Sequence, residues 1–488
     1  MPRSACLLVA VCLSITAPAP VAAQEPPWDA VVEVGRAHRQ VVELGPLGPD
    51  SIWPGFRPDT IPVLYVFPEQ GTLLMGWRGA LPDGFEAIGE LDGAGWQPEA
   101  ARAAASTGTL LEGRGTAQVV VHRPDVVRLV GLTVHEAFHV FQGGVREDGK
   151  RFGQGENAFL VTRYPVFDAE NEAAFALEGR LLEAALAEGS AGQALTLALQ
   201  FVAVREGRHR RLGAELSEFE KMAELNEGLA QYAGLRAVAI LTHHPRYESG
   251  AAREVERMLG DLDALITDTS RSFRQRFYRT GPAQSLILDR LADFDWKEWL
   301  MQENSTLQDA LAEVVGFWTR QRAWELEAYM EHGGAELGEL AERSVDAHRQ
   351  LRRAQADSAL SRPGLRLVIS GEALGYIGMC GIDPQNLLQV DAGVLLHTRW
   401  FVACASSALH AEFTAPVVHD QLRGTLEAVV GSPSEVKVSV GGEPFELADG
   451  SIEGAADVLV EAPGVTLHAP LADIEVEGTV LTIRPLRG

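Results

Sequence analysis

Two histidines and a glutamate stand within five residues of this chain, in the segment His135-Glu136-Ala137-Phe138-His139. On an α-helix, residues i and i+4 lie one above the other, so both imidazoles face the same side. The neighbouring residues from Thr133 to Phe141 are otherwise uncharged, which indicates a buried helix. Buried polar side chains are costly unless they have partners. The segment therefore predicts a helix on which His135 and His139 bind one metal ion.

Glu136 is expected to project beside the same site. The spacing His-Glu-x-x-His is the pattern of zinc-dependent peptidases, in which the histidines bind the metal and the glutamate accepts a proton from the attacking water. The sequence therefore predicts Zn²⁺ as the cofactor and Glu136 as the catalytic general base. Asp125 is expected to cap the start of this helix, and Gly143-Gly144 to end it.

The residues that follow the motif exclude one arrangement of ligands. A longer form of the motif, HExxHxxGxxH, supplies a third histidine from the same segment. Here Gln142 and Val145 occupy the positions of its glycine and its last histidine. A catalytic zinc usually keeps three protein ligands and one open position. The third ligand is therefore expected from another part of the chain.

A candidate for this ligand lies in the segment Asn226-Glu227-Gly228-Leu229-Ala230. The segment resembles the Asn-Glu-Gly-aromatic/Leu-Ala sequence of the aminopeptidase branch of the gluzincins, in which a glutamate from a second helix completes a His-His-Glu site. The resemblance implies a divergent exported member with a zincin-like fold, and Glu227 as the third ligand. Gly228 and Ala230 are small, and we expect them to let this helix approach the HExxH helix closely.

Other glutamates compete for roles at this site. The stretch between His139 and Glu227 is much longer than is usual in the gluzincins, so further helices must be inserted there. The competing third ligands are Glu170, Glu172 and Glu178, and Glu178, which lies on a predicted helix before a glycine, is the alternative to Glu227. Glu224 lies one turn before Glu227 and is either an outer partner that orients a ligand histidine or a surface carboxylate.

Hydrolysis of a peptide also needs a donor for the oxyanion that develops during attack. The segment Tyr278-Arg279-Thr280-Gly281 resembles the Tyr-x-x-Gly segment that begins a helix in many gluzincins. The resemblance implies that Tyr278 is the catalytic oxyanion stabiliser, although a tyrosine packed at a helix start would look the same. Tyr232 is a second candidate, and Arg279 could meet a substrate carboxylate.

Composition divides the chain into four parts. Residues 1–23 have a basic start, an apolar core and a small-residue cleavage site, which predicts a signal peptide and an exported protein, periplasmic or secreted. Residues 24–150 are expected to form an N-terminal α+β zincin subdomain, 151–360 a helical subdomain with the third ligand, and 361–488 an all-β domain, a small sandwich or barrel. The predicted fold class is α+β.

Within these parts, hydrophobic periodicity and turn residues predict individual elements. Thr116–His122 is expected to be an edge strand that could pair with an extended peptide. The other predicted strands are 61–67, 72–77, 365–370, 394–403, 425–430, 435–440, 457–461 and 480–485, and the predicted helices are 169–187, 193–208, 217–241, 253–266 and 307–331.

The formal net charge of −25 at pH 7 disfavours nucleic acid and anionic membranes as partners. After the leader, no apolar stretch is long enough to predict a stable membrane insertion. Cys380 and Cys404 remain in the mature chain, and an oxidising compartment would allow a disulfide, but the sequence leaves their pairing open. The sequence also leaves the oligomeric state open.

The motif and its resemblance together predict an exported zinc metallopeptidase that acts on a peptide or protein substrate. The alternative is a zincin-fold binding or structural protein without catalysis. The presence of Glu136 favours the enzyme, because a site that had lost activity would be free to lose its base. A purely structural zinc site that holds helices together is less favoured, because structural sites more often use cysteine ligands.

Overall fold

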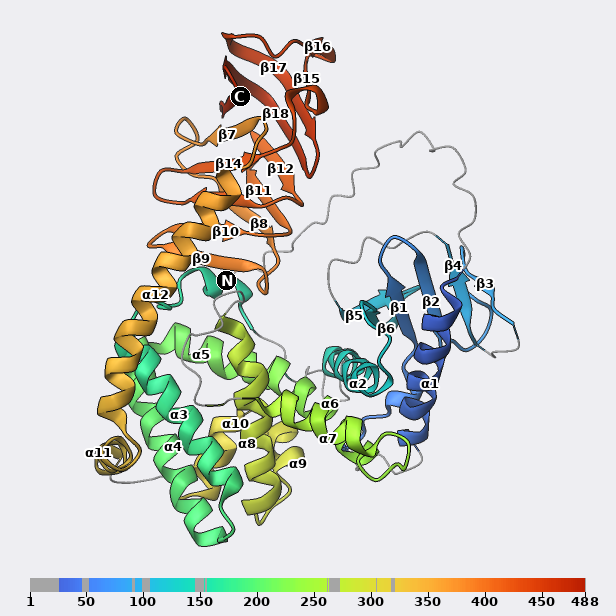
Figure 1. The fold of residues 1–488 in the computed structure, drawn as a ribbon, viewed down its shortest axis with the longest axis vertical. Helices are drawn as coiled ribbons and strands as arrows, with labels where there is room; N and C mark the ends of the chain where they lie inside the picture. The colour runs from blue at the N-terminus through green and yellow to red at the C-terminus, as the bar shows by residue number, and fades with distance from the viewer. Residues whose placement is uncertain are drawn as a thin grey trace, which may run out of the picture.

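The computed structural model describes residues 26–45, 52–89, 93–98, 106–144, 153, 156–260, 262, 273–303, 305–316 and 321–487. The predicted signal peptide lies outside these residues. The described chain combines helices with two sheets, in agreement with an α+β class. Figure 1 shows the N-terminal sheet beside a body of helices, with a second, larger sheet at the C-terminal end.

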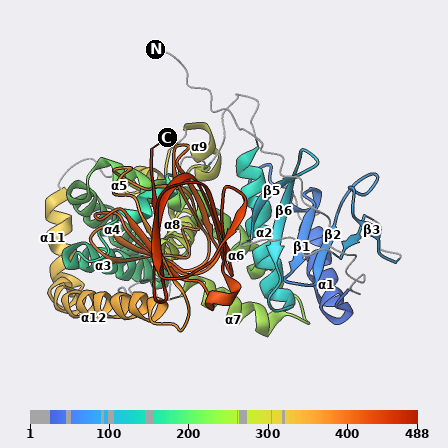
Figure 2. The same ribbon diagram turned by 90° about the horizontal axis from the view of Figure 1, so that it is seen from above.

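The N-terminal sheet has six strands within the described residues, in the order β3-β4-β2-β1-β6-β5. Among the strand pairs that the structure describes in this sheet, β1–β6 is the parallel one. Helix α1 and the motif helix α2 lie next to this sheet (Figures 1 and 2). The elements are α1 (Trp28–Leu44), β1 (Val63–Phe67), β2 (Gly71–Met75), β3 (Glu86–Ala87), β4 (Gly95–Gln97), β5 (Thr107–Leu111), β6 (Arg114–Val120) and α2 (Val126–Gly143), with the short 3₁₀ turn η2 (Pro58–Thr60).

The prediction that Thr116–His122 is an edge strand was wrong. Its strand, β6, lies between β1 and β5, and β5 forms the edge. A tight turn with positive φ at Glu112 and Gly113 reverses the chain and joins β5 to β6 as a hairpin. The sequence of β5 is short and mostly exposed, with a glycine inside it, so its alternation gives little strand signal.

The helical body follows, and several of its predicted helices have different limits. The predicted helix 307–331 is two helices, because Gly316 leaves the helical conformation with φ +61. The predicted helix 253–266 ends at Leu259, where Gly260 has φ +56. The helices are α3 (Ala169–Ala187), α4 (Ala191–Leu212), α5 (Ala214–Ala223), α6 (Leu229–Leu241), α7 (Glu248–Leu259), α8 (Phe277–Leu291), α9 (Trp296–Glu303), α10 (Leu307–Val314), α11 (Gln321–Glu331) and α12 (Gly334–Leu360), with the turns η3 (Ala158–Thr162), η4 (Glu224–Gly228) and η5 (Phe273–Arg276).

The N-terminal sheet and the helical body share one hydrophobic core, which runs from Val31 to Leu337. Trp53 lies at its centre, with its ring edge-on to Phe138 of α2 at 5.5 Å and to Trp296 of α9 at 5.4 Å. The motif helix is therefore fixed from both sides. Among the described helices, none is both long enough and apolar enough to cross a bilayer.

The C-terminal β unit, residues 361–487, contains one sheet of thirteen strands within the described chain. The predicted strand 394–403 is two strands, and Cys380 forms a disulfide with Cys404 between β8 and β11. The strands are β7 (Arg366–Ser370), β8 (Gly378–Ile382), β9 (Leu387–Asp391), β10 (Val394–His397), β11 (Phe401–Ala405), β12 (Leu409–Phe413), β13 (Val417–Asp420), β14 (Thr425–Val429), β15 (Lys437–Val440), β16 (Glu443–Phe445), β17 (Gly450–Ala462), β18 (Val465–Glu477) and β19 (Val480–Pro485), with the turn η6 (Pro433–Glu435).

The β unit is packed firmly on the helical body. Leu387 and Leu395 are buried in a cluster that also contains Phe277 and other residues of the helical body. Gln389 donates hydrogen bonds to the carbonyls of Val161 at 2.6 Å and Tyr164 at 2.9 Å. An apolar seam with satisfied polar groups fixes the position of one part on the other. The β8–β9 end of the sheet thus lies against the start of α8.

Candidate metal centre

The motif helix α2 begins and ends as the sequence predicted. The side chain of Asp125 accepts a hydrogen bond from the backbone N–H of Arg128 at 2.9 Å, which caps the first turn. The helix lies between the N-terminal sheet and α6 (Figure 2). It meets α6 where Gly131 faces Gly234, and a Cβ on Gly234 would lie 2.6 Å from the Gly131 carbonyl oxygen. This close crossing places the histidines of α2 beside η4, the short element that directly precedes α6.

That element carries Glu227 on a π-helical turn. The predicted continuous helix 217–241 is divided into α5 and α6 by η4, which spans Glu224–Gly228. A π turn inserts one extra residue and re-aims the side chains around it, and such turns often occur at functional sites. Gly228 contacts α8 rather than the HExxH helix, since a Cβ on Gly228 would lie 2.8 Å from the Cα of Gly281. The expected role of Gly228 was therefore wrong.

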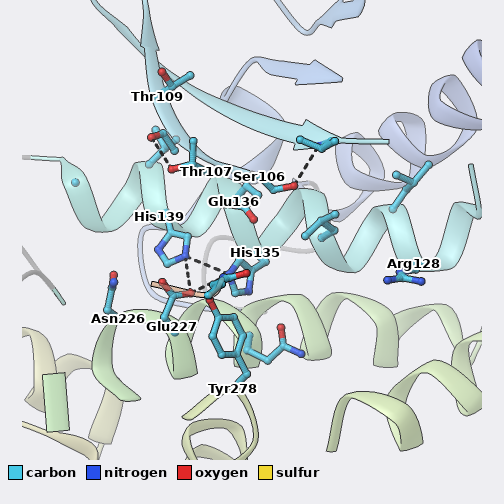
Figure 3. A pocket seen from close by; sticks show the side chains of 18 of the residues that line it. Ser106, Thr107, Thr109, Arg128, His135, Glu136, His139, Asn226, Glu227 and Tyr278 are labelled. Atoms are coloured by element: carbon cyan, nitrogen blue, oxygen red, sulfur yellow. Dashed lines mark hydrogen bonds and ion pairs between the residues drawn. The ribbon is translucent and has the colours of Figure 1, made fainter. Parts of the chain in front are cut away.

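The structure brings His135, His139 and Glu227 together (Figure 3). The two Nε2 atoms of the histidines are 3.1 Å apart, and Oε2 of Glu227 is 3.5 Å from that of His135 and 3.3 Å from that of His139. Ligand atoms around a tetrahedral zinc are roughly 3.3–3.6 Å apart, given metal–ligand distances of about 2.0–2.2 Å. Nitrogen and carboxylate donors with this spacing fit a divalent metal ion such as Zn²⁺.

The electrostatic environment keeps Glu227 ionised, which is the form in which a carboxylate binds a metal ion. Burial opposes ionisation of Glu227, but His139 and Arg274 lower its pKa well below the usual range. Burial would lower the pKa of His139, yet the Glu227 carboxylate raises it to about 9 in the metal-free protein. A bound cation would take the place of that proton, because a metal ligand must be a neutral imidazole.

Glu136 lies in the same buried group. Its carboxylate is within 4.8 Å of ligand atoms of His135 and His139, and the residue is only 4% exposed. Burial raises the pKa of Glu136, the two histidines oppose that effect, and Glu227 adds to it, with a net rise above the ordinary value. A carboxylate with a raised pKa is a better proton acceptor near neutral pH.

Gln142 and Arg274 contact the candidate ligands, and neither contact was predicted from the sequence. Oε1 of Gln142 accepts a hydrogen bond from Nδ1 of His139 at 3.0 Å, and Nε2 of Gln142 donates to the carbonyl of Leu225 at 3.0 Å. Arg274 donates to Oε1 of Glu227 at 2.8 Å and also pairs with Glu156. The i+3 spacing from His139 would have indicated Gln142, whereas no local signal indicates Arg274.

Tyr278 stands beside the metal-binding group at the first turn of α8. Its ring is stacked on that of His135, with centroids 5.7 Å apart and planes within 6°. Its hydroxyl oxygen accepts hydrogen bonds from Arg274 and Gln385. Burial raises the pKa of Tyr278 well above the usual range, and the carboxylate of Glu227 adds to the rise. The phenol therefore keeps its proton at neutral pH.

A cleft of about 1180 Å³ opens on this group. Most of β5 and parts of α2 and η4 line it, as Figure 3 shows for the labelled residues, and the β unit contributes Gln385, Asn386 and Arg399. Among the described residues, its charged lining consists, besides histidines, of the carboxylates Glu136 and Glu227 and the arginines Arg123, Arg128 and Arg399. The cleft is large enough for a peptide segment, and its floor carries the candidate metal ligands.

The competing carboxylates lie elsewhere. Glu178 is fully buried and paired with Arg205 and Arg208, so the structure does not bring it to the histidines. Glu170 pairs with Arg211 and Glu172 with Arg276. Glu224 is buried and accepts from Arg205 at 2.7 Å and from Thr280, so it is neither the partner of a ligand histidine nor a surface carboxylate. Arg205 and Arg208 thus belong to a buried ion network with Glu178, Glu220 and Glu224.

Two further candidates also point away from the cleft. Tyr232 donates from its hydroxyl to Asp289 at 2.6 Å and packs in the tryptophan cluster of the core. The side chain of Arg279 lies against Gly260 at the end of α7. The chain matches no protein-family model, no curated protein and no solved structure. Its chemistry is therefore inferred from its own residues.

Proposed function

We propose that the protein is a zinc-dependent metallopeptidase in which His135, His139 and Glu227 hold the metal. The observation that carries this proposal is the near-equilateral arrangement of their donor atoms beside the buried carboxylate of Glu136. When bound, zinc would lower the pKa of water and polarise the carbonyl of the scissile bond. The zincin-like character of the unit belongs to the same proposal.

The side chains supply the remaining chemistry. Glu136 accepts a proton from the attacking water and delivers it to the leaving amine, for which its raised pKa suits it. Tyr278 keeps its proton and donates a hydrogen bond to the substrate oxygen as negative charge develops there. Gln142 and Arg274 hold the ligands His139 and Glu227 in place.

An extended substrate can bind along β5. This strand is the sheet edge on the side of the cleft, and Ser106 to Leu110 line the cleft. An edge strand offers unpaired backbone groups to a peptide, which supports a peptide or protein substrate. Gly108 brings the strand close to α2, since a Cβ there would lie 3.3 Å from the backbone nitrogen of Val140.

An exported location, periplasmic or secreted, is part of the proposal. The Cys380–Cys404 disulfide is compatible with an oxidising compartment, and the N-terminal leader pattern supports the same location. The second candidate is a binding or structural protein with the same metal site but no catalysis. Intact Glu136 and Tyr278 at the cleft favour the enzyme over this alternative.

The decisive experiment combines metal content with hydrolysis. Purified protein is expected to bind about one zinc per chain and to cleave an unstructured protein such as casein. Glu136→Gln keeps the size of the side chain but removes the base, so we expect it to retain zinc and to lose cleavage by a factor of about 10³ or more. A wild-type protein that binds zinc but cleaves neither casein nor amino-terminal reporter peptides would establish the binding-protein alternative.

A further inference from the structure

The hydroxyl oxygen of Tyr278 has two hydrogen-bond donors from different parts of the chain. Arg274 donates from Nη1 at 3.2 Å, and Gln385 of the β unit donates from Nε2 at 2.9 Å. A hydroxyl oxygen accepts at most two hydrogen bonds and donates one. Because both acceptor positions are taken, the hydroxyl proton must point in the remaining direction.

That remaining direction faces Glu227, one of the candidate metal ligands, whose carboxylate lies close enough to the Tyr278 hydroxyl to act as its hydrogen-bond partner in the metal-free protein. Tyr278 lines the same cleft as Glu136 and Glu227, and its ring is stacked on His135 (Figure 3). The substrate oxygen would be polarised in this region during attack. A donor that is already oriented costs no reorganisation when the charge develops, which is the source of its catalytic effect.

The position of Gln385 is itself fixed by the β unit. Gln385 lies in the turn between β8 and β9, where its backbone N–H donates to Oδ1 of Asp383 at 3.0 Å. Asn386 donates from its side chain to the same carboxylate at 2.7 Å. The next residue, Leu387, is buried in the seam against the helical body. The turn therefore presents Gln385 to Tyr278 from a rigid support.

We propose that Gln385 is a positioning residue, which together with Arg274 makes the Tyr278 hydroxyl a dedicated donor toward the reacting carbonyl oxygen. The proposal rests on the proposed peptidase function. It also gives the β unit a role that the sequence left open: it completes the active site, where Asn386 and Arg399 of the same unit line the cleft.

Two substitutions at this position separate orientation from packing. Gln385→Leu removes the donor, and we expect kcat to fall about tenfold with little change in KM. Gln385→Glu replaces the donor by an acceptor that takes the Tyr278 proton, so we expect a fall of about 10²-fold, close to that of Tyr278→Phe. Gln421→Glu makes the same charge change at an exposed position of the β unit, outside the cleft lining, and is expected to keep wild-type kcat.

A double-mutant cycle and a spectroscopic measurement complete the test. Gln385→Glu should have almost no further effect on kcat in the Tyr278→Phe background, because both changes remove the same hydrogen bond. In metal-free protein labelled with ¹⁵N-glutamine, the side-chain amide signal lost in Gln385→Leu should shift in Tyr278→Phe. Zinc content should stay unchanged in every variant.

The outcomes distinguish the two proposals. A wild-type protein that cleaves peptides while Gln385→Glu behaves like Gln421→Glu overturns the positioning role and leaves the peptidase intact. Additive losses in the cycle, or an amide signal that Tyr278→Phe does not move, would overturn the positioning role in the same way. A wild-type protein without zinc binding or cleavage overturns the peptidase function, and the positioning role of Gln385 with it.

Discussion

Gln142 connects His139 to the turn that carries the third candidate ligand. Its Oε1 lies 3.0 Å from Nδ1 of His139, and its Nε2 donates to the carbonyls of Leu225 at 3.0 Å and Asn226 at 3.3 Å. One side chain thus sets the orientation of an imidazole and its distance from η4. Contacts of this kind fix the tautomer of a metal-binding histidine and raise its basicity.

We therefore predict that Gln142→Leu weakens zinc binding by about 10–100-fold. The measurement is competition with a chelator of known affinity, at fixed pH. Gln308→Leu is the matched control, because Gln308 is also a buried glutamine with a side-chain partner, Glu206, outside the cleft. Equal zinc affinities for the two variants would contradict the role assigned to Gln142.

The contact between Gly228 and Gly281 sets the approach of α8 to the π turn. A methyl group on Gly228 would lie 2.8 Å from the Cα of Gly281, and backbone cannot move aside cheaply. Gly228→Ala is expected to destabilise the protein by about 1–3 kcal/mol and to weaken zinc binding, because it displaces Glu227. Urea unfolding and chelator competition measure the two effects.

Gly338→Ala is the control for this substitution. Gly338 lies inside α12, and nothing lies within 4 Å of the position that its Cβ would take. Alanine there should stabilise the protein by about 0.5–1 kcal/mol, because it reduces the entropy lost on folding. A similar loss of stability in both variants would show that the cost does not come from the crossing of η4 and α8.

The motif helix could be predicted because the residues that determine it are close together in the sequence. The i, i+4 histidines, the Asp125 cap and the uncharged neighbours all lie within one helix. Glu227 was found only through a resemblance, since nothing in its immediate sequence requires a π turn. Arg274 and Gln385 reach the site by tertiary packing, and periodicity carries no information about such contacts.

The prediction that Thr116–His122 forms the edge strand was wrong for a different reason. Thr116–His122 contains three consecutive valines, Val119 to Val121, whereas β5 has only weak strand propensity and mostly exposed side chains. The hairpin turn at Glu112-Gly113, and not the composition of β5, adds that strand to the sheet. A strand that is defined by its partner is difficult to predict from its own residues.

Glu178 is predicted to support the fold rather than the metal. Its carboxylate accepts from Arg205 at 2.9 Å and from Arg208, and all three side chains are buried. Burial would raise the pKa of Glu178, but the two arginines lower it below the ordinary value. Breaking a buried ion pair from one side leaves uncompensated charge, so Glu178→Gln should cost about 3–5 kcal/mol in urea unfolding.

The same variant should keep its zinc stoichiometry at low temperature, where it remains folded. Glu183→Gln on the exposed side of α3 is the control, and it should change stability by less than about 0.5 kcal/mol. Loss of zinc from folded Glu178→Gln, with stability unchanged, would show that Glu178 is a metal ligand after all.

The arginines of the cleft predict a preference for acidic peptides. Arg123 and Arg128 are exposed at the cleft in a protein with a formal charge of −25. Arg128 precedes His135 by two helical turns, so it lies on the same face of α2 at roughly 10 Å along the axis. Arg128→Glu should lower kcat/KM several-fold for a peptide with acidic residues, relative to its neutral counterpart, and salt should reduce this difference.

Arg343→Glu on the exposed face of α12 changes the net charge equally and is the control. It should leave the ratio of kcat/KM for the acidic and neutral peptides at the wild-type value. An identical ratio in wild type, Arg128→Glu and Arg343→Glu would show that the cleft does not select by charge.

Two buried histidines of the β unit predict that acid weakens the fold. His397 and His419 have no hydrogen-bond partner among the described residues, and the ring of His397 is stacked on Phe401 at 3.9 Å. Burial lowers the pKa of His397 to about 3 and that of His419 to about 4. The unfolded chain, with histidine pKa values of about 6.5, therefore binds more protons than the folded chain between about pH 4 and 6.5.

Stability should consequently fall as the pH drops below about 6.5, with each histidine contributing a slope approaching 1.4 kcal/mol per pH unit. Urea unfolding between pH 7.5 and pH 5 measures this slope. Replacing both His397 and His419 by leucine should make it shallower, because carboxylate titration is common to both proteins. His410→Leu, at an exposed position on β12, should keep the wild-type slope. Parallel curves for wild type and the double variant would show that these histidines are not neutral in the folded protein.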